Sequence, residues 1–181
     1  MMERNGHFEI VTKLEAAERQ LWVAIRLFFE RRDAIAVHTL AAAAHSVLVD
    51  LARPRGVKIF FEKGKYARPE DKEDNEMLRA AQNFFKHGAK DPNQEHPFFF
   101  ETTSLLLYDA ALLHWRLTGA LSSEVSAFIS WYWGKNPDLL TRSKPSPELV
   151  EQVKNYARYD FDDILRLLDL NEKERRVARI T

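Results

Sequence analysis

The residues of this sequence best suited to chemistry lie between positions 79 and 88, in the run Arg-Ala-Ala-Gln-Asn-Phe-Phe-Lys-His-Gly. At about 100° per residue of a helix, Arg79, Asn83 and His87 follow one another along a single stripe, with Lys86 beside them. A stripe that holds an imidazole, an amide and two cations could move a proton and stabilise phosphate charge. We therefore take Arg79, Asn83 and His87 as candidate catalytic residues and Lys86 as a candidate phosphate-binding residue.

The same run predicts the end of a helix. Gly88 stands where a left-handed cap residue is expected, and Pro92 follows where a helix cannot continue. The helix dipole at that end favours a protonated imidazole. We expect the opposite face of the helix to be buried; it carries Met77, Leu78, Ala81, Phe84 and Phe85.

The segment from Asn83 to Gly88 resembles the Arg-Asn-x-x-x-His signature of HEPN domains. HEPN domains are small all-helical bundles; many are metal-independent ribonucleases, and others bind RNA or nucleotides without cleaving them. The resemblance implies that His87 and Asn83 are the motif residues, in a site that an Arg and a His complete across a homodimer. The motif Arg falls on Gln82, which can contact RNA but lacks the charged fork that grips phosphate. We infer that Arg79, one turn earlier, substitutes for it.

A basic segment provides further candidates for RNA contact. Positions 53 to 68 hold six Lys and Arg residues against one acidic residue, together with two phenylalanines. Such a segment could bind RNA through phosphate charge and base stacking, and Arg55 and Lys58 are its first candidates. The alternative is a solvated loop, whose apolar residues anchor it to the rest of the domain.

Asp109 lies among apolar residues of an expected helix, and a buried carboxylate needs a partner. One interpretation is that Asp109 supports the site from behind, by orienting His87 or holding Arg79. The other is a structural ion pair.

Composition limits the protein class. The chain has 181 residues, 45% of them hydrophobic and 30% charged, which is typical of one soluble globular domain. It has no cysteine, so a disulfide framework and a thiolate zinc site are excluded. We expect no cofactor, no bound metal, no membrane span and a cytoplasmic location. The net charge of zero argues against tight non-specific binding to nucleic acid.

The hydrophobic periodicity predicts an all-α fold, an antiparallel bundle of about four longer helices with a C-terminal extension of short helices. We expect a single HEPN-like domain, with the bundle core at 8–119 and the extension at 120–181. The expected helices cover 12–31, 33–52, a segment ending near 88, 102–119, 122–133, 146–158, 160–168 and 171–180.

The helix expected at 33–52 is apolar on nearly every side, which predicts burial on two faces. Its second face, formed by Ile35, His38, Ala42, His45 and Val49, must be covered by the C-terminal helices or by a second subunit. The HEPN resemblance favours a homodimer. His38 and His45 are about 10 Å apart along the axis, too far for a shared ion.

These observations support three hypotheses. The first is a HEPN-like protein that interacts with RNA or nucleotides, either as a metal-independent ribonuclease or as a non-catalytic relative. The second is a non-catalytic interaction module, a homodimer or an antitoxin-like partner of another protein. The third is a small-molecule or metal-binding bundle built on His38, His45, His87 or His114 with Asp109. The position of His87 distinguishes them. A cleft favours the first hypothesis, an open face favours the second, and the bundle interior favours the third.

Overall fold

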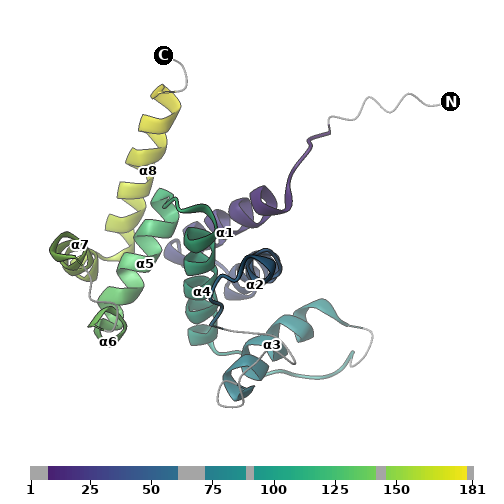
Figure 1. Cartoon of the computed structure of the whole chain (residues 1–181). Helices are drawn as coiled ribbons and strands as arrows, with labels where there is room; N and C mark the ends of the chain where they lie inside the picture. Colours follow the sequence, from purple (N-terminus) through teal and green to yellow (C-terminus); the bar gives the residue numbers. More distant parts are fainter. Residues whose placement is uncertain (1–7, 61–71, 89–91, 142–145, 179–181) are drawn as a thin grey trace.

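A computed structural model describes residues 8–60, 72–88, 92–141 and 146–178 (Figure 1). This part of the chain is built from eight α-helices and one short 3-10 helix, and it contains no strand, which confirms the all-α prediction. The elements are α1 (Lys13–Phe29), α2 (Ala34–Ala52), η1 (Arg53–Arg55), α3 (Lys72–Lys86), α4 (Phe100–Thr118), α5 (Ser123–Lys135), α6 (Pro137–Thr141), α7 (Pro147–Arg158) and α8 (Phe161–Ala178).

Helices α1 and α2 form a hairpin, and a side chain caps the start of each helix. Thr12 and Glu15 form a capping box at α1, in which the Glu15 carboxylate accepts from the Thr12 backbone N–H at 2.7 Å. Asp33 caps α2 by accepting from the Ala36 N–H at 2.9 Å. Arg31, between the two helices, has a φ of 53°, in the left-handed region that a tight connection requires.

Helix α2 is the central helix, and its own chain covers most of both faces. His38, Ala42, His45 and Val49 are buried, and α4 packs on this side while α1 packs on the other. The expectation that the C-terminal helices would cover this face is wrong, because α4 covers it instead. Ile35, at the start of the face, is 47% exposed, and coverage by a second subunit stays a prediction. The segment Ala34–Arg55 is the one described helix long and apolar enough to cross a membrane, with a mean hydropathy of 1.5; a helix in a protein core can pass the same test.

Helix α5 belongs to the central core rather than to a peripheral extension. Val125, Ala127 and Phe128 have no exposed surface. The Trp133 indole N–H donates to the Tyr108 hydroxyl at 2.9 Å, and Tyr132 stacks on Tyr108 with ring centroids 4.3 Å apart. Helix α4 ends at Gly119, whose φ of 69° confirms the expected left-handed cap.

The C-terminal region differs from prediction in two places. Where two short helices were expected, at 160–168 and 171–180, a single helix α8 runs through Asn171. The residues around Asn171 include no Gly or Pro, and the flanking Leu, Glu, Lys and Arg residues favour a helix, so the expected cap does not break it. The short helix α6, which begins at Pro137, was not predicted.

Helix α3 lies at the edge of the bundle (Figure 1) and packs on both α2 and α4. Leu78 and Ala81 are buried, and Phe85 packs edge-on against His38 with centroids 5.8 Å apart. The amide nitrogen of Gln82 lies 3.5 Å from the Ala42 carbonyl. Gln82 faces Ala42, and Phe85 faces His38. Since the residue numbers rise along α3 as they fall along α2, the two helices are antiparallel. The C-terminal end of α3 therefore lies beside the first half of α2.

Candidate functional site

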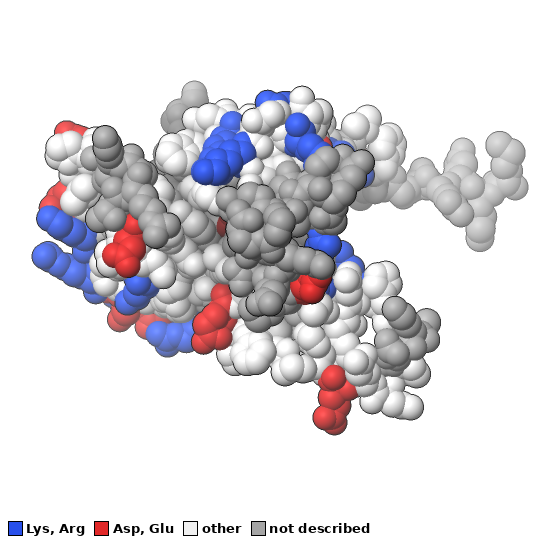
Figure 2. All heavy atoms as spheres, turned by 60° about the horizontal axis from the view of Figure 1, so that its bottom comes forward, with Lys and Arg blue, Asp and Glu red and all other residues white. Residues whose placement is uncertain are grey.

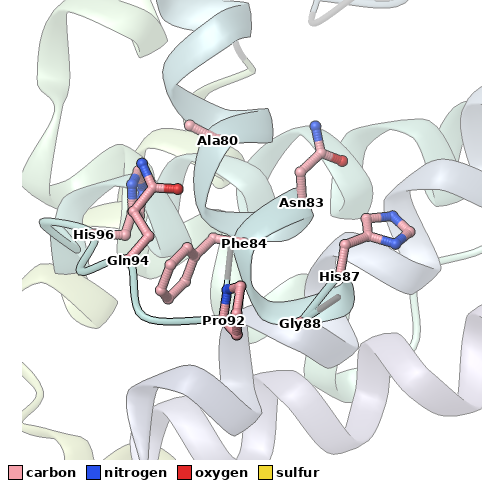
Figure 3. Close-up of a pocket in the computed structure, with 8 residues that line it drawn as sticks. All are labelled: Ala80, Asn83, Phe84, His87, Gly88, Pro92, Gln94 and His96. Atoms are coloured by element: carbon pink, nitrogen blue, oxygen red, sulfur yellow. The ribbon is translucent and has the colours of Figure 1, made fainter. Parts of the chain in front are cut away.

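An open hollow of about 540 Å³ lies at the C-terminal end of α3 (Figure 3). The last turns of α3 form one wall, and the segment after it forms the other. The lining residues are Ala80, Asn83, Phe84, His87, Gly88, Pro92, Gln94 and His96. Two amides, two imidazoles and one phenyl ring thus line the same hollow.

Phe84 and His96 form the aromatic part of this hollow. Their rings stack with centroids 5.3 Å apart and an interplanar angle of 27°. Phe84 and Phe85 are only half-buried, so the expectation that both would be fully buried is correct only in part. The half-buried Phe84 leaves part of an aromatic ring accessible beside four hydrogen-bonding side chains.

The helical phase expected for α3 is confirmed by exposure. Asn83 and His87 are exposed, and Leu78 and Ala81 are buried on the other side. Figure 3 shows the side chains of Asn83 and His87 on the same side of α3, one turn apart. The C-terminal cap differs from expectation, because Gly88 does not adopt the left-handed conformation; the His87 N–H instead continues the helical bonding to Asn83 O at 3.1 Å.

The other predicted residues of α3 do not line the hollow. Arg79 is half-buried, and Lys86 is exposed outside the lining. Gln82, at the position of the motif Arg, is directed toward the α2 backbone. Among the described residues, no Lys or Arg lines the hollow. In Figure 2, the end of the molecule that carries α3 is turned forward, and the lobe at the lower right consists mostly of uncharged side chains.

Arg55 and Lys58 lie far from the hollow. They follow the C-terminal end of α2, whereas the end of α3 packs near Ala42, about 20 Å away along the helix. Arg55 donates to the Leu51 carbonyl at 3.0 Å. The ammonium of Lys58 and the guanidinium of Arg116 both lie over the Phe60 ring, at 5.0 and 4.9 Å from its centroid. The rest of the basic segment, 61–71, lies outside the described residues.

Asp109 supports the bundle and not the α3 stripe. It is fully buried, and one of its carboxylate oxygens lies 2.9 Å from His45 Nε2. The interpretation in which Asp109 orients His87 or holds Arg79 is therefore wrong, and the alternative of a structural pair is confirmed. The reason is the helical phase: Asp109 points toward α2, which separates it from the exposed side of α3.

The other histidines also have separate partners. His38 Nδ1 lies 3.1 Å from Thr103 Oγ1, and burial lowers the pKa of His38 to about 4. His114 Nε2 lies 2.8 Å from a carboxylate oxygen of Glu18. The structure does not bring these side chains together with His87 as the third hypothesis requires. Among the described residues, no group of three His, Asp or Glu side chains could hold a metal ion.

Gln94 and His96 are functional candidates that the sequence did not single out. They lie in the stretch between α3 and α4, where no periodic pattern assigns a side chain to a face. The single hint was their proximity in sequence to the α3 stripe. The segment that carries Gln94 and His96 runs back along α3, and this path places the two residues opposite Asn83 and His87.

No protein-family model matches this sequence, and neither the curated proteins nor the solved structures contain a significant match.

Proposed function

We propose that this protein binds RNA or nucleotides, and that the hollow at the end of α3 holds an unpaired base. The observation that carries the proposal is the half-buried Phe84 ring beside Gln94 and His96, in a hollow that Asn83 and His87 also line (Figure 3). Unpaired bases are recognised by stacking on aromatic side chains and by hydrogen bonds to their edges. An aromatic ring with amides around it supplies both.

The charge distribution favours recognition of a base over recognition of a phosphate. The hollow lies at a helix C-terminus, where the dipole disfavours an anion, and its described lining residues include no Lys or Arg. Asn83 and Gln94 can each donate and accept, which suits the edge of a base. The phosphates of a bound strand would lie outside the hollow, where Lys86 is exposed on the same helix.

Binding of a fluorescently labelled single-stranded RNA, measured by anisotropy, tests this assignment. We expect Phe84→Ala to weaken binding by about tenfold or more, since stacking of one base is worth roughly 1–3 kcal/mol. Tyr159→Ala is the matched control, because Tyr159 is an exposed aromatic residue of another region. Duplex RNA of the same sequence should bind less well, because its bases are not available for stacking.

The Phe60 cluster is the rival site, since it also combines an aromatic ring with cations. If Phe60→Ala abolishes binding and Phe84→Ala does not, the ligand lies at the basic segment and the assignment to the hollow is refuted. Equal binding by the wild type and both variants would refute both sites.

Cleavage of RNA is a second candidate, supported by the exposure of His87 beside the amide of Asn83. In that case His87 would act as general base or acid at the 2′-hydroxyl. We expect His87→Ala to abolish cleavage and to retain most of the binding, and we expect chelators to leave the wild-type rate unchanged. Cleavage that persists in His87→Ala would exclude this residue as the catalyst.

A further inference from the structure

A second hollow, of about 520 Å³, lies at the opposite end of α1 from the N-terminus. Its lining is mostly apolar and also includes Arg31, Arg32 and Asp33. It lies where α1 ends, α2 begins and the chain enters α4. We call it the α1–α2 groove; its apolar wall consists of Phe28, Ile35, Val37, Phe98 and Phe100. Two of these side chains are unusually exposed for their size, Ile35 at 47% and Phe100 at 65%. Exposed apolar side chains that rim a concave surface mark sites of association.

The segment before α1 is also apolar and unpacked. Residues 8–12, which we call the arm, extend away from the bundle (Figure 1), and Phe8 and Ile10 are each 87% exposed. Residues two apart lie on one side of an extended chain, so Phe8 and Ile10 can enter a groove together. Glu9, between them, accepts two hydrogen bonds from the Arg19 guanidinium at 2.6 and 2.8 Å. This pair holds the arm at the start of α1, and the Arg19 guanidinium compensates the negative charge of Glu9.

The arm cannot reach the groove of its own chain. Thr12 and Phe28 are 16 residues apart along a helix, which places the groove about 24 Å from the base of the arm. The four residue-to-residue steps from Phe8 to Thr12 span at most about 14 Å, even when fully extended. The Glu9–Arg19 pair also keeps the arm at the far end of α1.

We propose that the arm of one chain occupies the α1–α2 groove of a second copy, with Phe8 and Ile10 as the inserted side chains. Reciprocal exchange of two arms gives a closed two-fold dimer, in which the same surfaces are used twice. The exchange buries Phe8, Ile10, Ile35 and Phe100, four of the large apolar side chains that this structure leaves exposed. Because the Glu9–Arg19 pair already orders the arm, little further ordering opposes binding.

Light scattering over a range of micromolar concentrations tests the dimer, with Phe8→Asp/Ile10→Asp as the arm variant and Phe100→Asp as the groove variant. We expect a dimer for the wild type and at least tenfold weaker dimerisation for each variant. Val23→Asp is the matched control, since Val23 is a surface residue of α1 with a similar exposed fraction to that of Ile35. All changed side chains are exposed, and circular dichroism verifies that each variant keeps its helices.

Cysteine cross-linking identifies the partners directly, because the natural sequence has no cysteine. In the double variant Ile10→Cys/Ile35→Cys we expect oxidation to give a disulfide-linked dimer. The variant Ile10→Cys/Val23→Cys should give much less. A wild type that is monomeric at every concentration would overturn the proposal, since another molecule must then fill the groove. A dimer that is insensitive to the arm variant, or equal cross-linking in the two cysteine variants, would also overturn it.

Discussion

Protonation of His38 should destabilise the fold, and the size of the effect follows from its burial. The side chain has no exposed surface, and burial lowers its pKa from the ordinary value of 6.5 to about 4. The unfolded chain therefore binds a proton more readily than the folded protein does between these two values. Stability is fully present above pH 6.5 and is lost as the pH falls toward 4. At 1.36 kcal/mol per pKa unit, the loss approaches about 3 kcal/mol.

Urea unfolding followed by circular dichroism at pH 7.5, 6, 5 and 4 measures this loss. The comparison is with His38→Gln, which cannot titrate but keeps a polar group that can reach Thr103 Oγ1. Carboxylates and the other histidines also contribute to the pH dependence, so the informative quantity is the difference between the two proteins. We expect the wild type to lose about 2 kcal/mol more than His38→Gln between pH 7.5 and pH 5.

Val23→Gln provides the control, since it changes an exposed side chain that does not titrate and should follow the wild-type pH profile closely. If the wild type and His38→Gln lose equal stability between pH 7.5 and pH 4, His38 is not held neutral in the folded state. The argument from its burial would then be refuted.

Three other substitutions test the packing. Gly134→Ala should cost about 1–3 kcal/mol in thermal unfolding, because the added methyl would lie 2.7 Å from the Ala157 Cβ; Ala157→Gly in the same chain should recover part of the loss. Asp109→Ala should cost about 3–5 kcal/mol by urea unfolding, since it leaves buried His45 without its carboxylate, and Asp109→Asn should cost less. Arg26→Leu should speed amide exchange in α8, because Arg26 lies within 3.5 Å of carboxylates on both α5 and α8; unchanged exchange would show that apolar contacts alone hold α8.

The positions of the main helices were predictable because their signals are local. Asp33, Ser122 and Ser146 each accept a backbone N–H at the start of a helix, as their sequence context indicates. Gly119 ends α4 for an equally local reason. Periodicity also gave the exposed side of α3 correctly, including Asn83 and His87.

Which surfaces meet in space was not predictable in the same way. The apolar second face of α2 is compatible with any apolar neighbour, and the sequence does not say that α4 is that neighbour. The partner of Asp109 was missed for this reason, since it depends on how α2 and α4 pair. The separation of Arg55 and Lys58 from His87 likewise follows from the antiparallel path of α3, which no local pattern records.

The two polar contacts between α2 and α4 also select one alignment of these helices. His38 meets Thr103 and His45 meets Asp109, so a spacing of seven residues on α2 matches a spacing of six on α4, in the same direction. Between the two histidines, the facing side of α2 carries the small residue Ala42, and such a smooth surface would tolerate sliding or rotation. Any such displacement would place the Asp109 carboxylate against methyl groups, at a high cost in desolvation. These polar pairs therefore give a single, non-degenerate packing to an interface whose apolar residues alone would allow several.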